Sequence, residues 1–391
     1  MRKYERTHPW ITFQLDIRKA SYKLWMALGE ARSKCQHIAG VPLRISTAQK
    51  LHQVYLVKGT QATTAIEGNT LSEEEVLQRL EGKLKLGPSK EYLGQEVDNI
   101  FKALNRVSSL MMEEGYDLLT VPRIKDFNRM VLEGLKLEEG VIPGEIPFHS
   151  VAVGRYSGAP REDCEYLLEQ MCSWLNGAEF RRSGEDALVF GLLRAILAHL
   201  YLAWIHPFGD GNGRTARLVE FQILLVAGVP TPAAHLLSNF YNQTRMEYYR
   251  QLDYASRSGG DVLPFVEYAL QGFVDGLKEQ LAVIRIQQWD VTWQNYVHSL
   301  FQGKESASDV RRRHLILDLS QRETTVPLSE IRRLTSRLAE AYATKTPKTL
   351  ARDLNELVEM GLVERRPEGF RAKREIILAF LPAHRHADIT P

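Results

Sequence analysis

The spacing of apolar residues along the chain predicts a mainly helical protein. Apolar side chains recur every three or four residues in several long segments, which places them on one face of a helix. One such set is Leu51, Val54, Tyr55 and Val57. This pattern continues through the first 140 residues or so, and we expect residues 1–110 to form an amino-terminal helical region.

Residues 141–158 interrupt the helical pattern. The segment alternates loosely between polar and apolar residues around Val151 and Val153, as a short strand or hairpin does. Helical spacing resumes after it. We therefore expect residues 111–300 to form a helical core that carries one β-hairpin.

The most apolar stretch of the chain is Ala187–Ile205, and it predicts a buried core helix. Arg194 and His199 interrupt the stretch, and the uncharged remainder is shorter than the roughly 20 residues that a membrane span requires. The amino terminus also lacks the apolar stretch of a secretory signal. We expect neither a membrane partner nor secretion by that route.

The pattern of apolar and polar residues changes after Phe301–Ser308, a segment of mostly small or polar residues that we interpret as a linker. Beyond it the spacing predicts three helices, at Arg311–Leu319, Leu328–Leu334 and Pro347–Met360. Two strands around Pro367, Glu368 and Gly369 follow. This order is typical of a winged helix-turn-helix, which we expect over residues 305–385.

Charge is nearly balanced over the whole chain but is positive in the predicted wing. Lys and Arg number 50 and Asp and Glu 48, so a net charge of +2 argues against a chain that binds a polyanion over its whole surface. The predicted wing, Arg365–Arg374, has five basic residues and one acidic residue, which suits phosphate contacts with DNA. Residues 305–381 as a whole carry 15 basic and 12 acidic residues, so docking to a protein, or dimerisation, is the alternative.

The three cysteines bear only on the cellular compartment that we expect. Cys35, Cys164 and Cys172 form no spacing that is typical of a structural metal site or a disulfide framework. A reducing compartment is the simplest setting for such a chain, and we expect a cytoplasmic protein.

Residues 206–217, HPFGDGNGRTAR, lie between two apolar helices and carry the candidate chemistry. Gly211 and Gly213 allow backbone conformations in which successive N–H groups point at one anion at the start of the following helix. Arg214 and Arg217 are three residues apart on that helix, so both guanidinium groups can contact a polyphosphate. The segment therefore predicts a phosphate site.

Two further side chains of this segment suit a reaction at that phosphate. Asp210 supplies an oxygen ligand of the kind that Mg²⁺ prefers beside phosphates. His206 has a side chain whose ordinary pKa suits removal of a proton from a hydroxyl at neutral pH.

The segment matches the motif HxFx(D/E)GNGRxxR at every fixed position, and the chain resembles the Fic family from about residue 15 to residue 300. The resemblance implies a mainly α fold: a helical core with a β-hairpin flap. It also implies an enzyme that transfers AMP from ATP to a Ser, Thr or Tyr hydroxyl of a target protein and releases pyrophosphate.

The resemblance also implies a role for each matching position. His206 would be the general base and Asp210 the Mg²⁺ ligand. The nucleotide would be held by the backbone of Gly211, Asn212 and Gly213 at the α-phosphate, by Arg214 and Arg217 at the β- and γ-phosphates, and by the flap at Val153 and Gly154. The flap would also align an extended segment of the target protein by strand addition.

A second family motif, (S/T)xxxE(G/N), matches the segment Thr63–Asn69. In the family it inhibits the enzyme, and here Glu67 would pair with Arg217 at the end of an inhibitory helix that stops near residue 68. The alternative is an ordinary helix end, because Gly68 favours termination and Glu67 could be a solvated residue in the last turn.

Tyr248 and Tyr249 match an aromatic pair that lies near the adenine in the family. The family often has Asn eight residues after the first Tyr, and this chain has Ser256 there. The alternative is that the pair belongs to the core, which is also the role that we expect for His199.

Two functions remain open from the sequence. The first is an autoinhibited protein adenylyltransferase with a winged-helix module, which the intact set of His206, Asp210 and Arg217 favours. The second is a DNA-binding transcriptional regulator whose Fic core senses a nucleotide or removes AMP. The sequence leaves open the target protein, the transferred group and whether the chain forms a homodimer.

Overall fold

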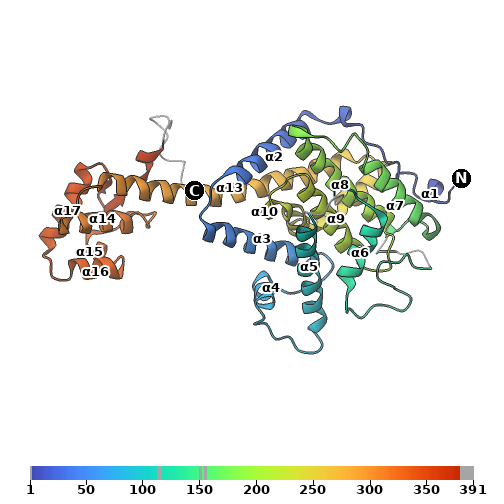
Figure 1. Cartoon of the computed structure of the whole chain (residues 1–391), viewed down its shortest axis with the longest axis horizontal. Coiled ribbons are helices and arrows are strands. Elements are labelled where there is room, and N and C mark those ends of the chain that lie inside the picture. Colours follow the sequence, from blue (N-terminus) through green and yellow to red (C-terminus); the bar gives the residue numbers. More distant parts are fainter. Residues whose placement is uncertain (1, 112–116, 149–151, 154–155, 379–391) are drawn as a thin grey trace. The chain divides into compact units, whose positions relative to one another are not determined.

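The computed structural model describes residues 2–111, 117–148, 152–153 and 156–378. Helices dominate it, and the strands form two short hairpins, so the predicted mainly α fold class is confirmed (Figure 1). The chain divides into two compact units, residues 1–281 and residues 282–391.

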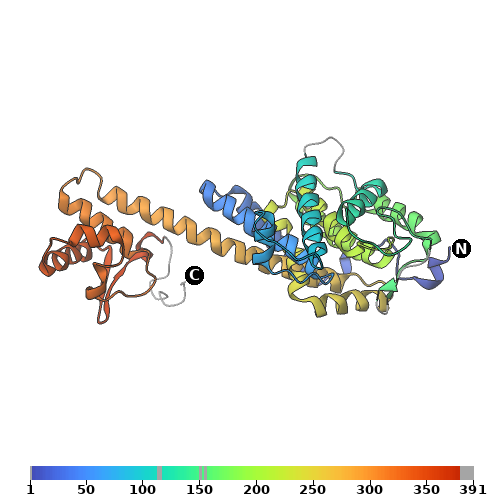
Figure 2. The same cartoon turned by 90° about the horizontal axis from the view of Figure 1, so that it is seen from below.

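The first unit is built from helices and one hairpin. Its helices are α1 (Tyr4–Thr7), α2 (Tyr22–Gly40), α3 (Ile45–Ala65), α4 (Glu73–Leu80), α5 (Glu91–Leu110), α6 (Val121–Leu132), α7 (Arg161–Leu175), α8 (Ala187–Ile205), α9 (Asn212–Val226), α10 (Thr231–Ala234), α11 (Leu236–Gln243) and α12 (Arg245–Arg257). Helix α13 (Leu263–Leu300) is one continuous helix with residues in both units (Figure 2). Short 3₁₀ turns lie at Ile17–Lys19 and Gly184–Asp186.

Helices α8 and α9 lie side by side in the middle of the first unit (Figure 1). They approach closely because Gly191 has no side chain: a Cβ built there would lie 2.1 Å from the Cβ of Ala227. Helix α8 is long and apolar enough to cross a bilayer by length and composition alone, yet 83% of its apolar window is buried inside the protein. It is the core helix that the sequence predicts.

The predicted hairpin is present between α6 and α7. Strand β1 (Ala152–Val153) pairs antiparallel with β2 (Tyr156–Ser157), with Val153 opposite Tyr156. Val151 and Gly154 lie outside the described residues, and so does the side chain of Val153. The predicted nucleotide contacts of Val153 and Gly154 therefore stay predictions.

The second unit contains the helices α14 (Ala307–Leu319), α15 (Leu328–Ile331), α16 (Ser336–Tyr342) and α17 (Pro347–Glu359), followed by strands β3 (Val363–Arg366) and β4 (Gly369–Ala372) and a 3₁₀ turn at Arg374–Ile377. A bridge joins Val326 to Phe370 of β4. The unit has its own apolar core, which includes Trp293, Leu315 and Leu354.

The sequence predicts three helices after the linker, and the described residues there form four. The helix expected over Leu328–Leu334 ends at Ile331, and α16 follows as a separate helix. Thr335 explains the break, because its backbone is extended and its side chain accepts a hydrogen bond from the Leu338 N–H, 3.2 Å away, as a helix N-cap does.

The predicted domain boundaries at residues 110 and 300 stay predictions. Residues on either side of position 110 belong to one compact unit, and the division between the two units falls within α13, upstream of the predicted linker. Site residues from both predicted regions, Glu67 and His206 among them, accordingly lie in one unit.

Candidate functional site

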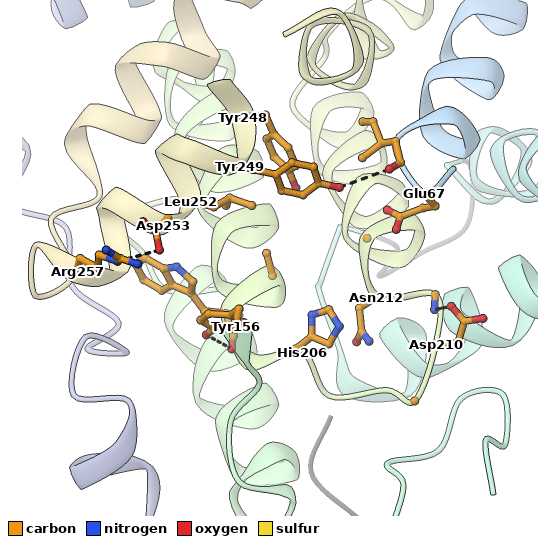
Figure 3. A pocket seen from close by; sticks show the side chains of 16 residues that line it. Glu67, Tyr156, His206, Asp210, Asn212, Tyr248, Tyr249, Leu252, Asp253 and Arg257 are labelled. Atoms are coloured by element: carbon orange, nitrogen blue, oxygen red, sulfur yellow. Dashed lines mark hydrogen bonds and ion pairs between the residues drawn. The ribbon is translucent and has the colours of Figure 1, made fainter. Parts of the chain in front are cut away.

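Eight of the residues singled out by the sequence line a cavity of about 450 Å³ in the first unit (Figure 3), whereas Arg214 and Arg217 are not among its lining residues. Its lining includes Glu67, His206, Asp210, Gly211, Asn212, Gly213, Tyr248 and Tyr249. These residues come from the end of α3, from the loop and first turn that join α8 to α9, and from α12. Segments far apart in the sequence are thus brought to one hollow.

His206 follows the last residue of α8 and turns the chain out of the helix. Its backbone adopts the left-handed conformation, with φ of 49°, which is uncommon for a residue other than glycine and is often found at functional sites. Burial lowers the pKa of His206 below its ordinary value, although nearby Glu67 and Asp210 oppose the change. The imidazole is therefore neutral at pH 7 and can accept a proton.

Asn212 holds the loop that follows. Its side-chain oxygen accepts a hydrogen bond from the Phe208 N–H at 2.9 Å, and its amide donates to the Phe208 carbonyl oxygen at 2.6 Å. Gly211 just before it has a φ of +75°, which glycine adopts without strain. Because the Asn212 side chain is engaged with the loop, only its backbone N–H is left to face an anion.

Asn128 on α6 fixes this loop from behind, and the sequence analysis missed it. Its buried amide donates to the Asp210 carbonyl oxygen at 2.9 Å and to the Thr215 hydroxyl at 3.2 Å. Its side-chain oxygen accepts from the Gly144 N–H at 2.8 Å. A polar residue on the apolar face of a predicted helix was the available signal.

Asp210 and Arg214 belong to an ion-pair network. Arg214 contacts Asp210 at 3.0 Å and Glu96 of α5 at 2.9 Å, and its side chain is almost fully buried. Glu96, which sequence reasoning also missed, accepts a second hydrogen bond from Asn69. Arg214 thus already contacts two carboxylates in the structure, and its predicted phosphate contact stays a prediction.

The residues present fit a magnesium ion at Asp210. The carboxylate is 48% exposed and lies at the cavity, beside the turn expected to bind phosphate. No cluster of three or more metal-ligating side chains exists among the described residues. Mg²⁺ commonly binds through one or two carboxylates and takes its other ligands from substrate phosphates and water, so a single aspartate suffices.

Glu67 contacts Arg217, as the sequence predicts. Helix α3 ends at Ala65, and the Glu67 Oε1 atom accepts from the Arg217 Nη2 atom at 2.5 Å. The same Nη2 atom donates to the Thr63 carbonyl oxygen at 2.9 Å, so the pair is a single contact rather than a two-pronged one. The Arg217 side chain is 1% exposed. Burial on its own would raise the pKa of Glu67, but Arg217 outweighs it and the pKa is lowered.

The Glu67 carboxylate also lies against the first turn of α9. A Cβ built at Gly213 would lie 2.1 Å from the Glu67 Oε1 atom. The unpaired N–H groups of a helix start attract anions, and this turn is the one that the sequence assigns to phosphate. Glu67 therefore lies at the turn for which the sequence predicts phosphate binding.

The two tyrosines of α12 have different surroundings. Tyr248 is buried, and its hydroxyl group lies 2.9 Å from the His199 Nε2 atom. Tyr249 is 42% exposed, and its hydroxyl donates to the Ile66 carbonyl oxygen at 3.4 Å. Both rings line the cavity, and contact with a nucleotide stays a prediction. His199 is fully buried, as expected for a core residue.

The far end of the cavity was not predicted. Leu252, Asp253 and Arg257 of α12 lie there, and the Asp253 carboxylate pairs with Arg257 at 2.9 Å (Figure 3). No sequence signal distinguishes this pair from the many solvated pairs four residues apart on helix surfaces.

The predicted basic wing of the second unit is partly neutralised. Arg366 and Arg371 both contact Glu364, at 3.0 Å and 3.3 Å. Arg374 contacts Asp290 at 2.5 Å. Only part of the charge that the sequence assigns to DNA phosphates is therefore available in the wing.

Comparison with known proteins points to one family. Residues 118–224 match the model of the Fic/DOC family. The chain is 32% identical over 207 residues to protein adenylyltransferase fic-1 of Caenorhabditis elegans, which covers 53% of this chain and 37% of that protein. It is 28% identical over 247 residues to protein adenylyltransferase Fic of Aedes aegypti, covering 63% and 45%. The chain thus spans less than half the length of these relatives.

Solved structures agree on the fold. A Fic family protein from Desulfovibrio desulfuricans matches with a TM-score of 0.54 and 20% identity, over 90% of this chain and 96% of that one. A fragment of Fic-1 from C. elegans matches with a TM-score of 0.52 and 26% identity, over 67% and 71%. The first of these, at that identity, supports the fold alone.

Proposed function

Because the chain carries a Fic domain over residues 118–224, we propose that it is a protein adenylyltransferase. It transfers AMP from ATP to a Ser, Thr or Tyr hydroxyl of a target protein and releases pyrophosphate. The observation that carries the proposal is that His206, whose pKa is lowered, lines one cavity with the glycine-flanked start of α9 and with Glu67, the carboxylate that pairs with Arg217.

In the proposed reaction His206 removes the proton of the target hydroxyl. The hydroxyl oxygen forms a bond to the α-phosphorus of ATP as the bond from that phosphorus to the bridging oxygen of pyrophosphate breaks. The backbone of residues 211–213 orients the α-phosphate, and Arg214 and Arg217 bind the phosphates that leave. Mg²⁺ held by Asp210 would offset their negative charge.

We propose that Glu67 restrains this reaction. Its carboxylate lies on the first turn of α9 and pairs with Arg217, the group expected to hold the γ-phosphate. With that guanidinium engaged, a bound triphosphate is displaced from the alignment that attack requires. Release of Glu67 would then activate the enzyme.

The target would dock at the hairpin of β1 and β2. Each strand pairs with only one neighbouring strand among the described residues, so an extended peptide could add at the other edge. A cytoplasmic location remains part of the proposal, since the three cysteines are buried and unpaired.

The position of the label in the product tests the proposed chemistry. Purified chain is incubated with Mg²⁺ and a lysate, using ATP labelled on the α-phosphate in one reaction and on the γ-phosphate in another. We expect protein labelling from the α-label only. Labelling from the γ-label would indicate a kinase and contradict the proposal.

The matched control is His206→Ala. It should lower transfer by about 10² to 10⁴, the usual cost of losing a general base. Binding of ATP should persist, because the imidazole acts on the target hydroxyl. A variant that keeps more than about a tenth of the activity would assign the proton transfer to another group.

A second candidate function is DNA binding by the second unit. The observation that favours it is the order of elements, in which α14 to α17 precede the hairpin of β3 and β4, as in a winged helix-turn-helix. Lys348 and Arg352 are exposed on α17, the helix that would enter the major groove. Docking to a protein or to a second copy of the chain is the alternative use of this unit.

A further inference from the structure

The first unit has a second hollow, of about 610 Å³, that shares no lining residue with the candidate active site. It lies where α7 ends, α8 begins and α9 ends, and three of its lining residues are Arg181, Arg182 and Arg194. Arg194 precedes His206 by 12 residues on α8, which corresponds to about 18 Å along the helix.

Arg194 is buried, and it forms no ion pair with a carboxylate of the described residues. It is 5% exposed, and its Nη2 atom donates to the Asn176 side-chain oxygen at 2.7 Å and to the Asp117 carbonyl oxygen at 3.3 Å. Its Nε atom has no hydrogen-bond partner in the described part of the chain. Burial lowers the pKa of Arg194 to about 10, so it still carries its charge at pH 7.

The hydrogen bonds of Arg194 to described residues go to uncharged oxygen atoms, which compensate a buried cation less than a carboxylate does, so an anion bound beside it would be favourable. The other two arginines increase the positive charge. Arg181 pairs with Asp117, whereas Arg182 lies over the ring of Phe190 at 5.3 Å. Among the described residues that line the hollow, the three arginines and the single carboxylate of Asp117 leave a net charge of +2.

We propose that this hollow binds the phosphate group of a small phosphate monoester. Such a group carries about −1.5 to −2 charges near pH 7, which matches the lining, whereas a carboxylate carries only −1. Guanidinium groups bind phosphate oxygens through paired hydrogen bonds. The volume is within the range of small-molecule sites, so it accommodates an organic group as well.

The simplest alternative is that Arg194 only holds the chain together at Asp117 and Asn176. That role needs only the hydrogen bonds from Arg194 to the Asp117 backbone carbonyl and to the Asn176 side chain. It requires neither Arg181 nor Arg182. Binding measurements on variants of the two outer arginines therefore separate a ligand site from a purely structural arginine.

The experiment titrates the full chain with inorganic phosphate, and separately with glycerol 2-phosphate, by calorimetry at constant ionic strength. The variants are Arg182→Gln and the double variant Arg181→Gln, Arg182→Gln, with Arg106→Gln as the matched control, since Arg106 is exposed on α5 outside the hollow. Phosphate can also bind at the start of α9, so the variants decide which binding event belongs to the hollow.

We expect one binding event to weaken about tenfold in Arg182→Gln, and more in the double variant, because each loses charge-assisted hydrogen bonds. Arg106→Gln should bind as the parent does. Arg194→Lys, which keeps the charge but loses the fork, should weaken the same event if the variant folds.

Three results would overturn the proposal. The first is the absence of any phosphate binding by the parent chain. The second is an unchanged titration in the double variant, which would leave Arg194 a structural residue. The third is equally strong binding of acetate at the same event, which would contradict selection of a dianion.

Discussion

A single carboxylate, Glu67, contacts Arg217 and lies against the turn that we propose to bind phosphate. Replacing it by glycine, Glu67→Gly, should raise adenylylation about 100-fold, because Arg217 is freed and the triphosphate can align. The measurement is incorporation of α-labelled AMP into protein, including self-modification. Equal activity of the parent and the variant, both folded and able to bind ATP, would leave Glu67 as an ordinary residue at a helix end.

The freed arginine provides the control for this prediction. The double variant Glu67→Gly, Arg217→Ala should lose the gain, since the same guanidinium is required for the γ-phosphate. A double variant as active as Glu67→Gly would mean that the carboxylate acts by filling space at Gly213 and not by engaging Arg217.

The pH dependence of transfer follows from the surroundings of His206. Only the neutral imidazole can accept a proton, and burial lowers its pKa, so activity should fall on the acid side at a pH below the ordinary 6.5. Glu67 favours the charged imidazole and raises this pKa. In Glu67→Gly the acid limb of a kcat/KM profile should therefore move to still lower pH. A limb that stays in place or moves up would contradict the assignment.

At the scale of elements, α6 supports the site through Asn128. Asn128→Ala removes the hydrogen bonds to the Asp210 carbonyl oxygen, the Thr215 hydroxyl and the Gly144 N–H. Because these polar groups would then lack that hydrogen-bond partner, the free energy of unfolding should fall by about 1 to 3 kcal/mol. Urea denaturation measures the loss. Activity should fall as well, because the loop that carries Asp210 loses its support.

A separate variant controls for a general effect of α6. Lys125→Ala lies on the same helix and removes only a partly exposed ion pair with Glu165, so it should change stability by less than about 1 kcal/mol. If Asn128→Ala is no more destabilising than Lys125→Ala, the loop does not depend on Asn128.

The same elements explain what the sequence could predict. Residues 206–217 lie together along the chain, so their spacing alone predicts a phosphate site, and Gly68 indicates the end of α3 to within three residues. Asn128 and Glu96 reach the loop from α6 and α5, and only the packing of those helices brings them there. The break at Thr335 was also missed, because its capping bond competes with the apolar pattern that continues across it.

At the scale of the whole molecule, the chain combines a unit that includes the match to the Fic/DOC family model with a second unit that has its own core. Asp353 illustrates how this unit is held together: it accepts hydrogen bonds from Arg311, Arg312 and Tyr342. The exposed residues of α17 are not needed for that core. Substitutions among them can therefore test binding with little effect on folding.

The last prediction concerns DNA. Lys348 and Arg352 are exposed on α17 and form no ion pair with the described residues, while much of the wing charge is neutralised by Glu364 and Asp290. If the unit binds DNA, helix α17 should therefore neutralise more phosphates than the wing does. The test uses the full chain with Lys348→Ala and Arg352→Ala, which should bind a duplex more weakly. The logarithm of its binding constant should also depend less steeply on the logarithm of the salt concentration, by about one unit of slope for each phosphate that is no longer neutralised. Arg366→Ala, which removes a side chain already paired with Glu364, should change that slope far less. Fluorescence anisotropy over a range of salt measures both. If the parent chain binds no duplex in low salt, the DNA proposal is wrong and docking to a protein becomes the proposed use of this unit, with light scattering as the test for a second copy of the chain.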